Sequence, residues 1–161
     1  MLSDILRRRT GRLLTAVLAL LAAVAVTVVP AHSASAATRV PIFLEVRGDS
    51  SQKLAGIYGW IEFNDSTTYT YQFYLCRESS YSAAGGYVKI NDRATLRASY
   101  SLNWGDTTIP ECRYPAQLYG ATDYVGSTVR NVTVEVEGVN FNGQNQATWK
   151  KDWFTYDNPF N

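Results

Sequence analysis

Histidine and cysteine are scarce in this chain of 161 residues, which contains one histidine, His32, and two cysteines, Cys76 and Cys112. A Ser-His-Asp triad, a Cys-His pair and a histidine metal site each require an imidazole as base or ligand. The fate of His32 therefore decides whether these chemistries are open to the protein. Charge is nearly balanced, at 15 basic and 14 acidic residues, so the chain has no strong field of either sign.

The segment that holds His32 has the layout of a secretory signal peptide. Arginines at positions 7, 8, 9 and 12 precede an uncharged apolar run over 13–29, and small residues follow over 33–37. The run is close to the lower length limit of a membrane helix, so an uncleaved membrane anchor is the alternative. We predict that residues 1–37 are a signal peptide, cleaved after Ala36 or Ala37, and that the protein is secreted without His32.

Residues 38–161 are sufficient for one domain with a modest core. Loss of 1–37 removes four of the 15 basic residues and one of the 14 acidic residues, which leaves 11 against 13 and a net charge of −2. Phosphate binding needs clustered positive charge. We therefore predict a single extracellular domain over 38–161 that does not bind nucleic acid and is not held in a membrane.

Both cysteines lie in the exported part, and an even number of cysteines in an oxidising compartment favours a disulfide. A Cys76–Cys112 bond closes a loop of 36 residues, which stabilises a fold by about 3 to 4 kcal/mol in the loop-entropy model. A reactive thiol or a metal ligand is the alternative, but the exported chain has neither a histidine nor a third cysteine to support it. We predict the disulfide and no metal site.

Apolar and polar residues alternate along most of the exported chain, and helical periodicity is missing. The alternation over 68–76, 96–104 and 130–137 is typical of half-buried antiparallel strands. Weaker strands are expected over 40–47, 56–63, 86–90 and 147–156, separated by turn residues such as Asn64-Asp65-Ser66, Ala84-Gly85-Gly86 and Asn142-Gly143. About seven or eight strands predict an all-β, two-sheet antiparallel β-sandwich, with an immunoglobulin-like arrangement preferred by analogy.

The hairpin formed by 56–63 and 68–76 can pair in two registers. An even loop pairs Trp60 with Tyr71, whereas an odd loop places Phe63 opposite Tyr69 and joins the apolar residues of both strands in one layer. We favour the odd loop, because register is set where it buries the apolar face. The opposite, solvated face then carries Thr70 and the candidate ligand-binding residues Tyr58, Trp60, Glu62, Gln72 and Tyr74.

Aromatic residues are the remaining functional signal, since all four tryptophans and eleven tyrosines lie in 38–161. A sugar ring has apolar C–H faces and polar edges, so an exposed Trp or Tyr beside Glu, Gln or Asn suits a carbohydrate site. A structural role is the alternative, because small sandwiches also fill gaps with Tyr and Trp. We predict a non-catalytic binding module for carbohydrate or cell-envelope material, with no catalytic residue and no cofactor.

Two other function classes stay open. A loop over 78–85 or 105–110 would suit a proteinaceous inhibitor that inserts into the cleft of an extracellular hydrolase. Paired carboxylates would suit a small glycosidase, which needs two acids on opposite sides of a bond. Glu135 and Glu137 share one face of one strand, where such a pair is ordinarily solvated surface. Further carboxylates, which the sequence alone cannot place, are Glu62, Asp106 and Glu111.

The C-terminal sequence WKKDWFTYDNPFN ends a predicted strand at Asp157-Asn158-Pro159, because proline cannot donate to a sheet ladder. The signal-peptide layout, the short β pattern with two cysteines and this Asp-Asn-Pro-aromatic ending together resemble small secreted β-sandwich proteins of actinobacterial type. The resemblance extends loosely over the whole chain. It implies a bacterial, secreted sandwich, and it carries over no functional residue because that group has no assigned activity.

Overall fold

The computed structural model describes residues 39–79 and 83–161, and these residues form eight β-strands and no helix. The strands are β1 (Arg39–Arg47), β2 (Lys53–Phe63), β3 (Thr68–Arg77), β4 (Ala84–Ile90), β5 (Thr95–Leu102), β6 (Gln117–Tyr124), β7 (Asn131–Phe141) and β8 (Ala147–Asp157). A helix with the length and apolar character of a membrane span is not found within these described ranges.

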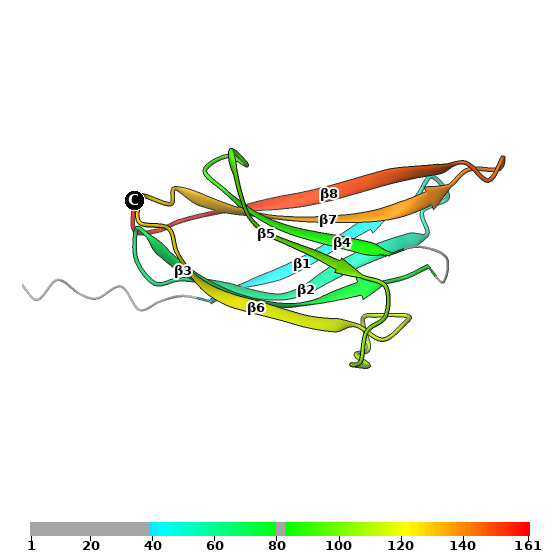
Figure 1. Ribbon diagram of the computed structural model, residues 1–161, viewed down its shortest axis with the longest axis horizontal. Coiled ribbons are helices and arrows are strands. Elements are labelled where there is room, and N and C mark those ends of the chain that lie inside the picture. The colour runs from blue at the N-terminus through cyan, green and yellow to red at the C-terminus, as the bar shows by residue number, and fades with distance from the viewer. Residues whose placement is uncertain (1–38, 80–82) are drawn as a thin grey trace, which may run out of the picture. The chain divides into compact units, whose positions relative to one another are not determined.

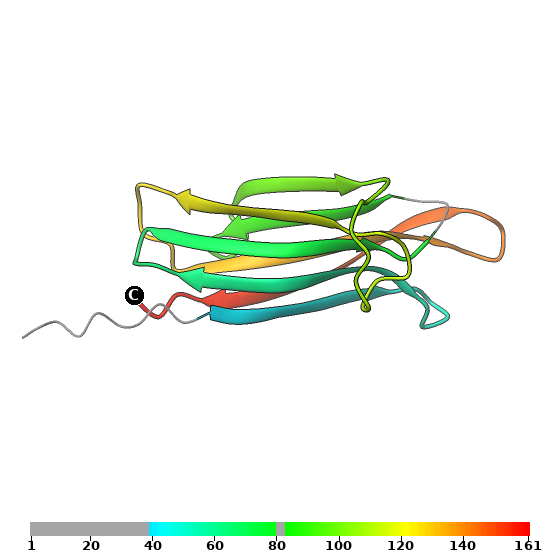
Figure 2. The same ribbon diagram turned by 90° about the horizontal axis from the view of Figure 1, so that it is seen from below.

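The strands form two four-stranded antiparallel sheets that face each other (Figure 1, Figure 2). Sheet A has the order β1-β2-β3-β6 and sheet B has the order β5-β4-β7-β8. A disulfide joins Cys76 at the end of β3 to Cys112 in the connection between β5 and β6. The predicted all-β, two-sheet antiparallel sandwich with one disulfide is confirmed.

The strand order differs from the immunoglobulin one that we preferred by analogy. In a constant-type immunoglobulin domain the third strand joins the second sheet. Here β1, β2 and β3 are consecutive neighbours in sheet A, and the chain first crosses to sheet B after β3. The reason is local: only residues 64–67 connect β2 to β3. So short a connection returns the chain antiparallel beside the strand it has left.

Seven of the eight strands lie where the alternating pattern predicts them. The exception is β6, where the pattern predicts no strand. It contains Gly120 and Asp123, both of types depleted in strands, and it pairs with β3 alone at the edge of sheet A. The predicted turn at Ala84-Gly85-Gly86 is wrong, because these residues begin β4. Glycine allows β4 to pack closely against β7 there, because a Cβ at Gly85 would overlap the side chain of Glu137.

The core confirms the odd register of the β2–β3 hairpin. The last pair of the hairpin is Phe63 opposite Tyr69, so that the five residues 64–68 lie between these partners, and Ile61 lies opposite Tyr71. These four side chains point into the sandwich and are buried, as are Ile57, Phe73 and Leu75 on the same layer. The hairpin therefore adopts the register that buries its apolar side chains. The intervening residues of β2 and β3 lie on the outer face of sheet A.

Tyrosines also join the two sheets at the edge formed by β5 and β6. The rings of Tyr100 and Tyr119 stack with centroids 4.3 Å apart, and the hydroxyls of Tyr100 and Tyr71 are 2.6 Å apart. The hydroxyl of Tyr69 donates to Asp123 Oδ2 at 2.8 Å. These buried hydroxyls thus have partners, which allows large rings to fill the core without leaving a polar group unsatisfied.

Candidate functional site

All five predicted ligand-binding residues lie on the outer face of sheet A. This follows from the register, because residues that alternate along a strand with the buried ones point away from the core. Cross-strand pairing arranges the face in rows that run across β1, β2, β3 and β6 (Figure 2). We refer below to an aromatic row (Phe43, Tyr58, Tyr74 and Leu118) and a neighbouring mixed row (Pro41, Trp60, Gln72 and Gly120).

The aromatic row is the most apolar part of this face. Phe43 is 70% exposed, and its ring meets Tyr58 edge-on with centroids 5.1 Å apart. Tyr74 is partly exposed and Leu118 is exposed at the far end of the row. Phe43 was not among the predicted site residues, although the alternation of Ile42, Leu44 and Val46 could have placed it on the outer face of an edge strand.

The mixed row places polar groups beside these rings. Arg39 Cζ lies 4.0 Å from the centroid of the Trp60 ring, and Arg39 Nε donates to Glu62 Oε2 at 2.7 Å. Gln72 is exposed beside Trp60, and the next position in the row is Gly120, which contributes no side chain. The face therefore combines a partly exposed indole with a guanidinium, a carboxylate and an amide.

Tyr58 departs from its predicted position on a solvated surface, because the structure leaves it only 7% exposed. Its hydroxyl donates to Glu45 Oε1 at 2.8 Å and accepts from Lys53 Nζ at 3.0 Å. Burial, together with the Glu45 carboxylate, raises the pKa of Tyr58 to about 12. Tyr58 thus packs edge-on against Phe43 and does not itself offer a free ring.

An ion pair between Glu45 and Lys53 completes this network, with Lys53 Nζ 2.7 Å from Glu45 Oε1. Burial raises the pKa of Glu45, but hydrogen bonds from Lys53 and Tyr58 outweigh it and the pKa is lowered overall. Burial likewise lowers the pKa of Lys53, and the hydrogen bonds to Glu45 and Tyr58 outweigh it, so that the pKa is raised. Both groups are therefore charged at neutral pH.

The disulfide explains why Tyr58 is covered. Cys76 and Cys112 have Cα atoms 5.4 Å apart, within the usual range for a disulfide. The bond holds the β5–β6 connection over one end of sheet A (Figure 2), where Ile109 and Ala116 pack with Tyr58 and Cys76. The loop over 105–110, which an inhibitor would insert into an enzyme, is thus packed against the sheet at Ile109.

No family model, curated protein or solved structure matches this chain. The function is therefore inferred from the residues and their geometry alone.

The four tryptophans do not form one surface, and none of them is buried. Trp60 lies on the outer face of sheet A, whereas Trp149 and Trp153 lie on edge strand β8 of sheet B. Trp104 follows β5 and is 78% exposed, although the alternating pattern over 96–104 grouped it with apolar residues. Its strand ends at Leu102, so the alternation no longer applies, and Arg77 Cζ lies 4.4 Å from its ring centroid.

Glu135 and Glu137 lie on the outer face of sheet B, but the prediction of an ordinary solvated pair is wrong for Glu135. It is 1% exposed, and its carboxylate pairs with three cations, Lys89 at 2.7 Å, Arg93 at 2.7 Å and Lys151 at 3.3 Å. Burial raises its pKa, but the hydrogen bonds from Lys89 and Lys151 outweigh burial and lower it overall. A general acid of a glycosidase needs a raised pKa instead.

The tetrapeptide Ser50-Ser51-Gln52-Lys53 was not predicted as a site, but it matches the Ser-x-x-Lys pattern of a serine nucleophile with a lysine base. A lysine base must be neutral to accept a proton. The ammonium of Lys53 is held by Glu45, with a raised pKa, so this lysine stays protonated. Within 39–79 and 83–161, no three His, Cys, Asp or Glu side chains form a group that could hold a metal ion.

Proposed function

We propose that this protein is a secreted, non-catalytic module that binds carbohydrate or cell-envelope polysaccharide through the outer face of sheet A. One observation carries the proposal: the register sets exposed Phe43 and partly exposed Trp60 in adjacent rows, beside Arg39, Glu62 and Gln72. Aromatic carbon next to charged and amide groups is what the two kinds of surface on a sugar ring require.

Each side chain has a distinct role in the proposed complex. The Phe43 ring stacks against the C–H face of a sugar, and Trp60 extends this apolar surface into the next row. The Glu62 carboxylate accepts from sugar hydroxyls, whereas the guanidinium of Arg39 donates to sugar oxygens. Gly120 leaves the neighbouring position free of a side chain, so that an extended saccharide can lie across the sheet.

Export is part of this proposal, since a module for external polysaccharide acts outside the cell. The basic and apolar segments within 1–37 and the Cys76–Cys112 disulfide support it. Intact mass spectrometry of the protein recovered from culture medium should show a chain that begins at residue 37 or 38, with both thiols oxidised. A secreted form that retains His32 or has two free thiols would contradict the export scheme.

The binding proposal is tested by retention on insoluble polysaccharides, such as cellulose, chitin and isolated cell-wall sacculi, combined with a glycan array. Phe43→Ala and Trp60→Ala should each weaken retention about tenfold, the loss expected when a stacking contact of about 1 to 1.5 kcal/mol disappears. Trp153→Ala is the matched control, because it removes an exposed tryptophan from the other sheet. It should leave retention unchanged.

The same experiment distinguishes the other function classes. Wild-type protein that passes through every polysaccharide, yet slows a secreted protease or amylase at nanomolar concentration, would replace the proposal with the inhibitor function. Turnover of a glycan that is lost when one carboxylate is neutralised would replace it with a glycosidase. Retention that survives both Phe43→Ala and Trp60→Ala would place the binding surface elsewhere.

A further inference from the structure

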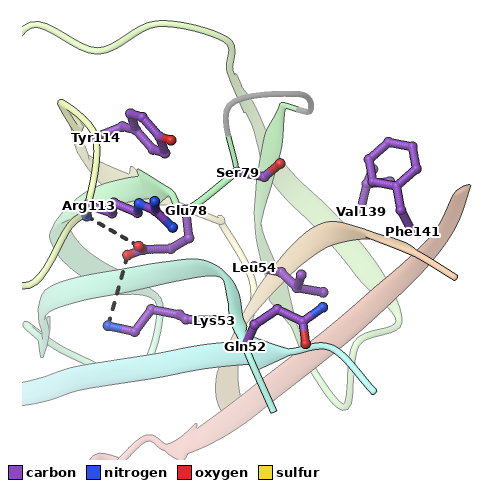
Figure 3. A pocket seen from close by; sticks show the side chains of 9 residues that line it. All are labelled: Gln52, Lys53, Leu54, Glu78, Ser79, Arg113, Tyr114, Val139 and Phe141. Atoms are coloured by element: carbon purple, nitrogen blue, oxygen red, sulfur yellow. Dashed lines mark hydrogen bonds and ion pairs between the residues drawn. The ribbon is translucent and has the colours of Figure 1, made fainter. Parts of the chain in front are cut away.

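A cavity of about 320 Å³ lies at the end of the sandwich where the disulfide-bonded connection meets the start of β2 and the end of β7 (Figure 3). Four segments that are far apart in the sequence contribute to it. Its lining residues are Gln52, Lys53, Leu54, Glu78, Ser79, Arg113, Tyr114, Val139 and Phe141. The cavity is separate from the exposed aromatic and mixed rows of sheet A and plays no part in the proposed polysaccharide binding.

Glu78 is the unusual residue in this cavity. Its side chain is more than nine-tenths buried, and the residue is 8% exposed. Oxygen Oε2 accepts from the backbone N–H of Arg113 at 3.2 Å. Among the described residues, none donates a hydrogen bond to the other oxygen, Oε1, although this atom is buried. A buried carboxylate oxygen without a hydrogen-bond donor lowers the stability of the fold, so the presence of such an oxygen at Glu78 needs an explanation.

Lys53 is the nearest ion-pair partner, but its three ammonium donors already have other acceptors. It bonds Glu45 at 2.7 Å, the hydroxyl of Tyr58 at 3.0 Å and the carbonyl of Glu111 at 3.2 Å. An ammonium group has three N–H donors. Its distance to Glu78 Oε1 is 3.9 Å, beyond hydrogen-bond range. The three donors of Lys53 are therefore directed at Glu45, Tyr58 and Glu111, and Lys53 leaves Glu78 Oε1 with an ion-pair contact but no hydrogen bond.

The opposite side of the cavity is apolar. Leu54 and Val139 are buried, and Phe141 stands exposed at the mouth, where Figure 3 shows it beside Val139 and across from the Glu78 carboxylate. Two cations also line the cavity: Lys53, which is paired with Glu45, and exposed Arg113, whose guanidinium lies 5.6 Å from the centroid of the Tyr114 ring. A ligand that reaches Glu78 Oε1 meets a hydrogen-bond acceptor there and aliphatic or aromatic carbon on the opposite side. This arrangement suits a molecule with a donor head and a short apolar body.

We infer that this cavity binds a small organic ammonium ion, whose N–H group donates to Glu78 Oε1 and whose apolar body packs on Val139 and Phe141. A charged donor suits the site better than a neutral hydroxyl, because both can donate to the carboxylate but only the ammonium adds Coulomb attraction to the hydrogen bond. The ligand supplies the donor that the protein lacks. Binding requires no covalent step and no cofactor.

The test is an NMR titration of the purified protein with n-butylammonium, n-butanol and n-butyrate, which share an apolar body and differ in the head group. Butylammonium should bind saturably, with chemical-shift changes centred on Glu78, Ser79 and Val139. Butanol should bind about tenfold more weakly, as expected if the Coulomb attraction between the ammonium and the carboxylate contributes about 1.4 kcal/mol. Butyrate, which repeats the charge of Glu78, should not bind there.

Glu78→Gln should weaken butylammonium binding at least tenfold. The matched control is Glu111→Gln, which neutralises an exposed carboxylate of the same disulfide-bonded connection and should change the dissociation constant less than twofold. Phe141→Ala supplies a second variant in case Glu78→Gln disturbs the fold, and loss of its apolar contact should weaken binding about threefold.

Equal binding of butanol and butylammonium, or unchanged affinity in Glu78→Gln, would overturn the inference. So would shifts that map to Phe43 and Trp60 on the outer face of sheet A. If Glu78→Gln unfolds, Phe141→Ala decides the matter, because it leaves the head-group contact in place and removes only the apolar one. Unchanged affinity in that variant would then overturn the inference. Polysaccharide retention should be unaffected by Glu78→Gln, so failure of the cavity and failure of the proposed function are separate results.

Discussion

Lys53 Nζ lies 3.9 Å from Glu78 Oε1, too far for a hydrogen bond, although both side chains line the same cavity. The gap exists because Glu45 and Tyr58 hold the ammonium group on the other side. Lys53 thus donates to Tyr58 of the aromatic row and leaves Glu78 Oε1, a buried oxygen, without a hydrogen-bond donor among the described residues. Removal of the negative charge of Glu78 should therefore stabilise the fold but weaken the binding of a ligand in the cavity.

Glu78→Gln should increase the free energy of unfolding at pH 7 by about 1 kcal/mol, the lower end of the cost of an unsatisfied buried group. Burial raises the pKa of Glu78 above its ordinary value of 4.5. A raised carboxyl pKa leaves stability intact below 4.5 and reduces it as pH rises through the folded-state pKa. Urea unfolding of both proteins at about pH 7 and about pH 4 should therefore show the gain only at the higher pH. A loss of stability at pH 7 would contradict this account.

Tyr71 and Tyr100 should show strong energetic coupling, because their hydroxyls meet at 2.6 Å between the two sheets. Tyr100→Phe leaves the buried Tyr71 hydroxyl without that partner, and should cost about 1 to 2 kcal/mol. The double variant with Tyr71→Phe removes both hydroxyls and should cost less than the sum of the single variants. A double-mutant cycle by chemical denaturation measures the coupling. Strict additivity would show that the contact contributes nothing.

Glu135→Gln should lower the free energy of unfolding by about 3 kcal/mol at pH 7, because it leaves three cations without their buried counter-charge. The pKa of Glu135 is lowered, so its contribution is present above the ordinary value of 4.5 and is lost as pH falls through the folded-state pKa. The difference between the two proteins, measured by urea unfolding over a range of pH, should accordingly shrink in acid.

The control for this measurement is Glu62→Gln, which neutralises a partly exposed carboxylate paired with Arg39 on the other sheet. It should change stability by no more than about 0.5 kcal/mol, as is usual for ion pairs near the surface. If the two glutamine variants lose equal stability, the buried Glu135 carboxylate contributes no more to the free energy of unfolding than a surface ion pair does.

Replacement of both cysteines by serine should lower the free energy of unfolding by about 3 to 4 kcal/mol, from the entropy of the 36-residue loop. It should also release Ile109 from the outer face of sheet A and increase the exposure of Tyr58. Guanidinium unfolding measures the first effect, and hydrogen exchange of the backbone around Thr107 and Ala116 measures the second. Unchanged protection at these two residues would show that the connection holds its place without the disulfide.

Local alternation was enough to predict most strands and the register of the β2–β3 hairpin, since a shift of one residue would have moved Phe63, Tyr69 and Tyr71 to the solvent. The Cys76–Cys112 pairing was predictable as well, because only two cysteines exist. Alternation failed at β6, where Tyr119 is the main inward apolar side chain and the strand is defined by pairing with β3. In an edge strand of this kind, the alternation of apolar and polar residues is too weak to predict the strand from the sequence.

The candidate surface was predictable only in part for the same reason. Alternation placed Trp60 and Gln72 on one outer face, because both positions follow from strand parity. It could not show that a disulfide-bonded connection covers Tyr58, or that three cations surround a buried Glu135. Nor could it bring residues 52–54, 78–79, 113–114 and 139–141 around one cavity. Strand parity depends on neighbours in the chain, whereas burial and charge compensation depend on groups that only the folded chain brings into contact.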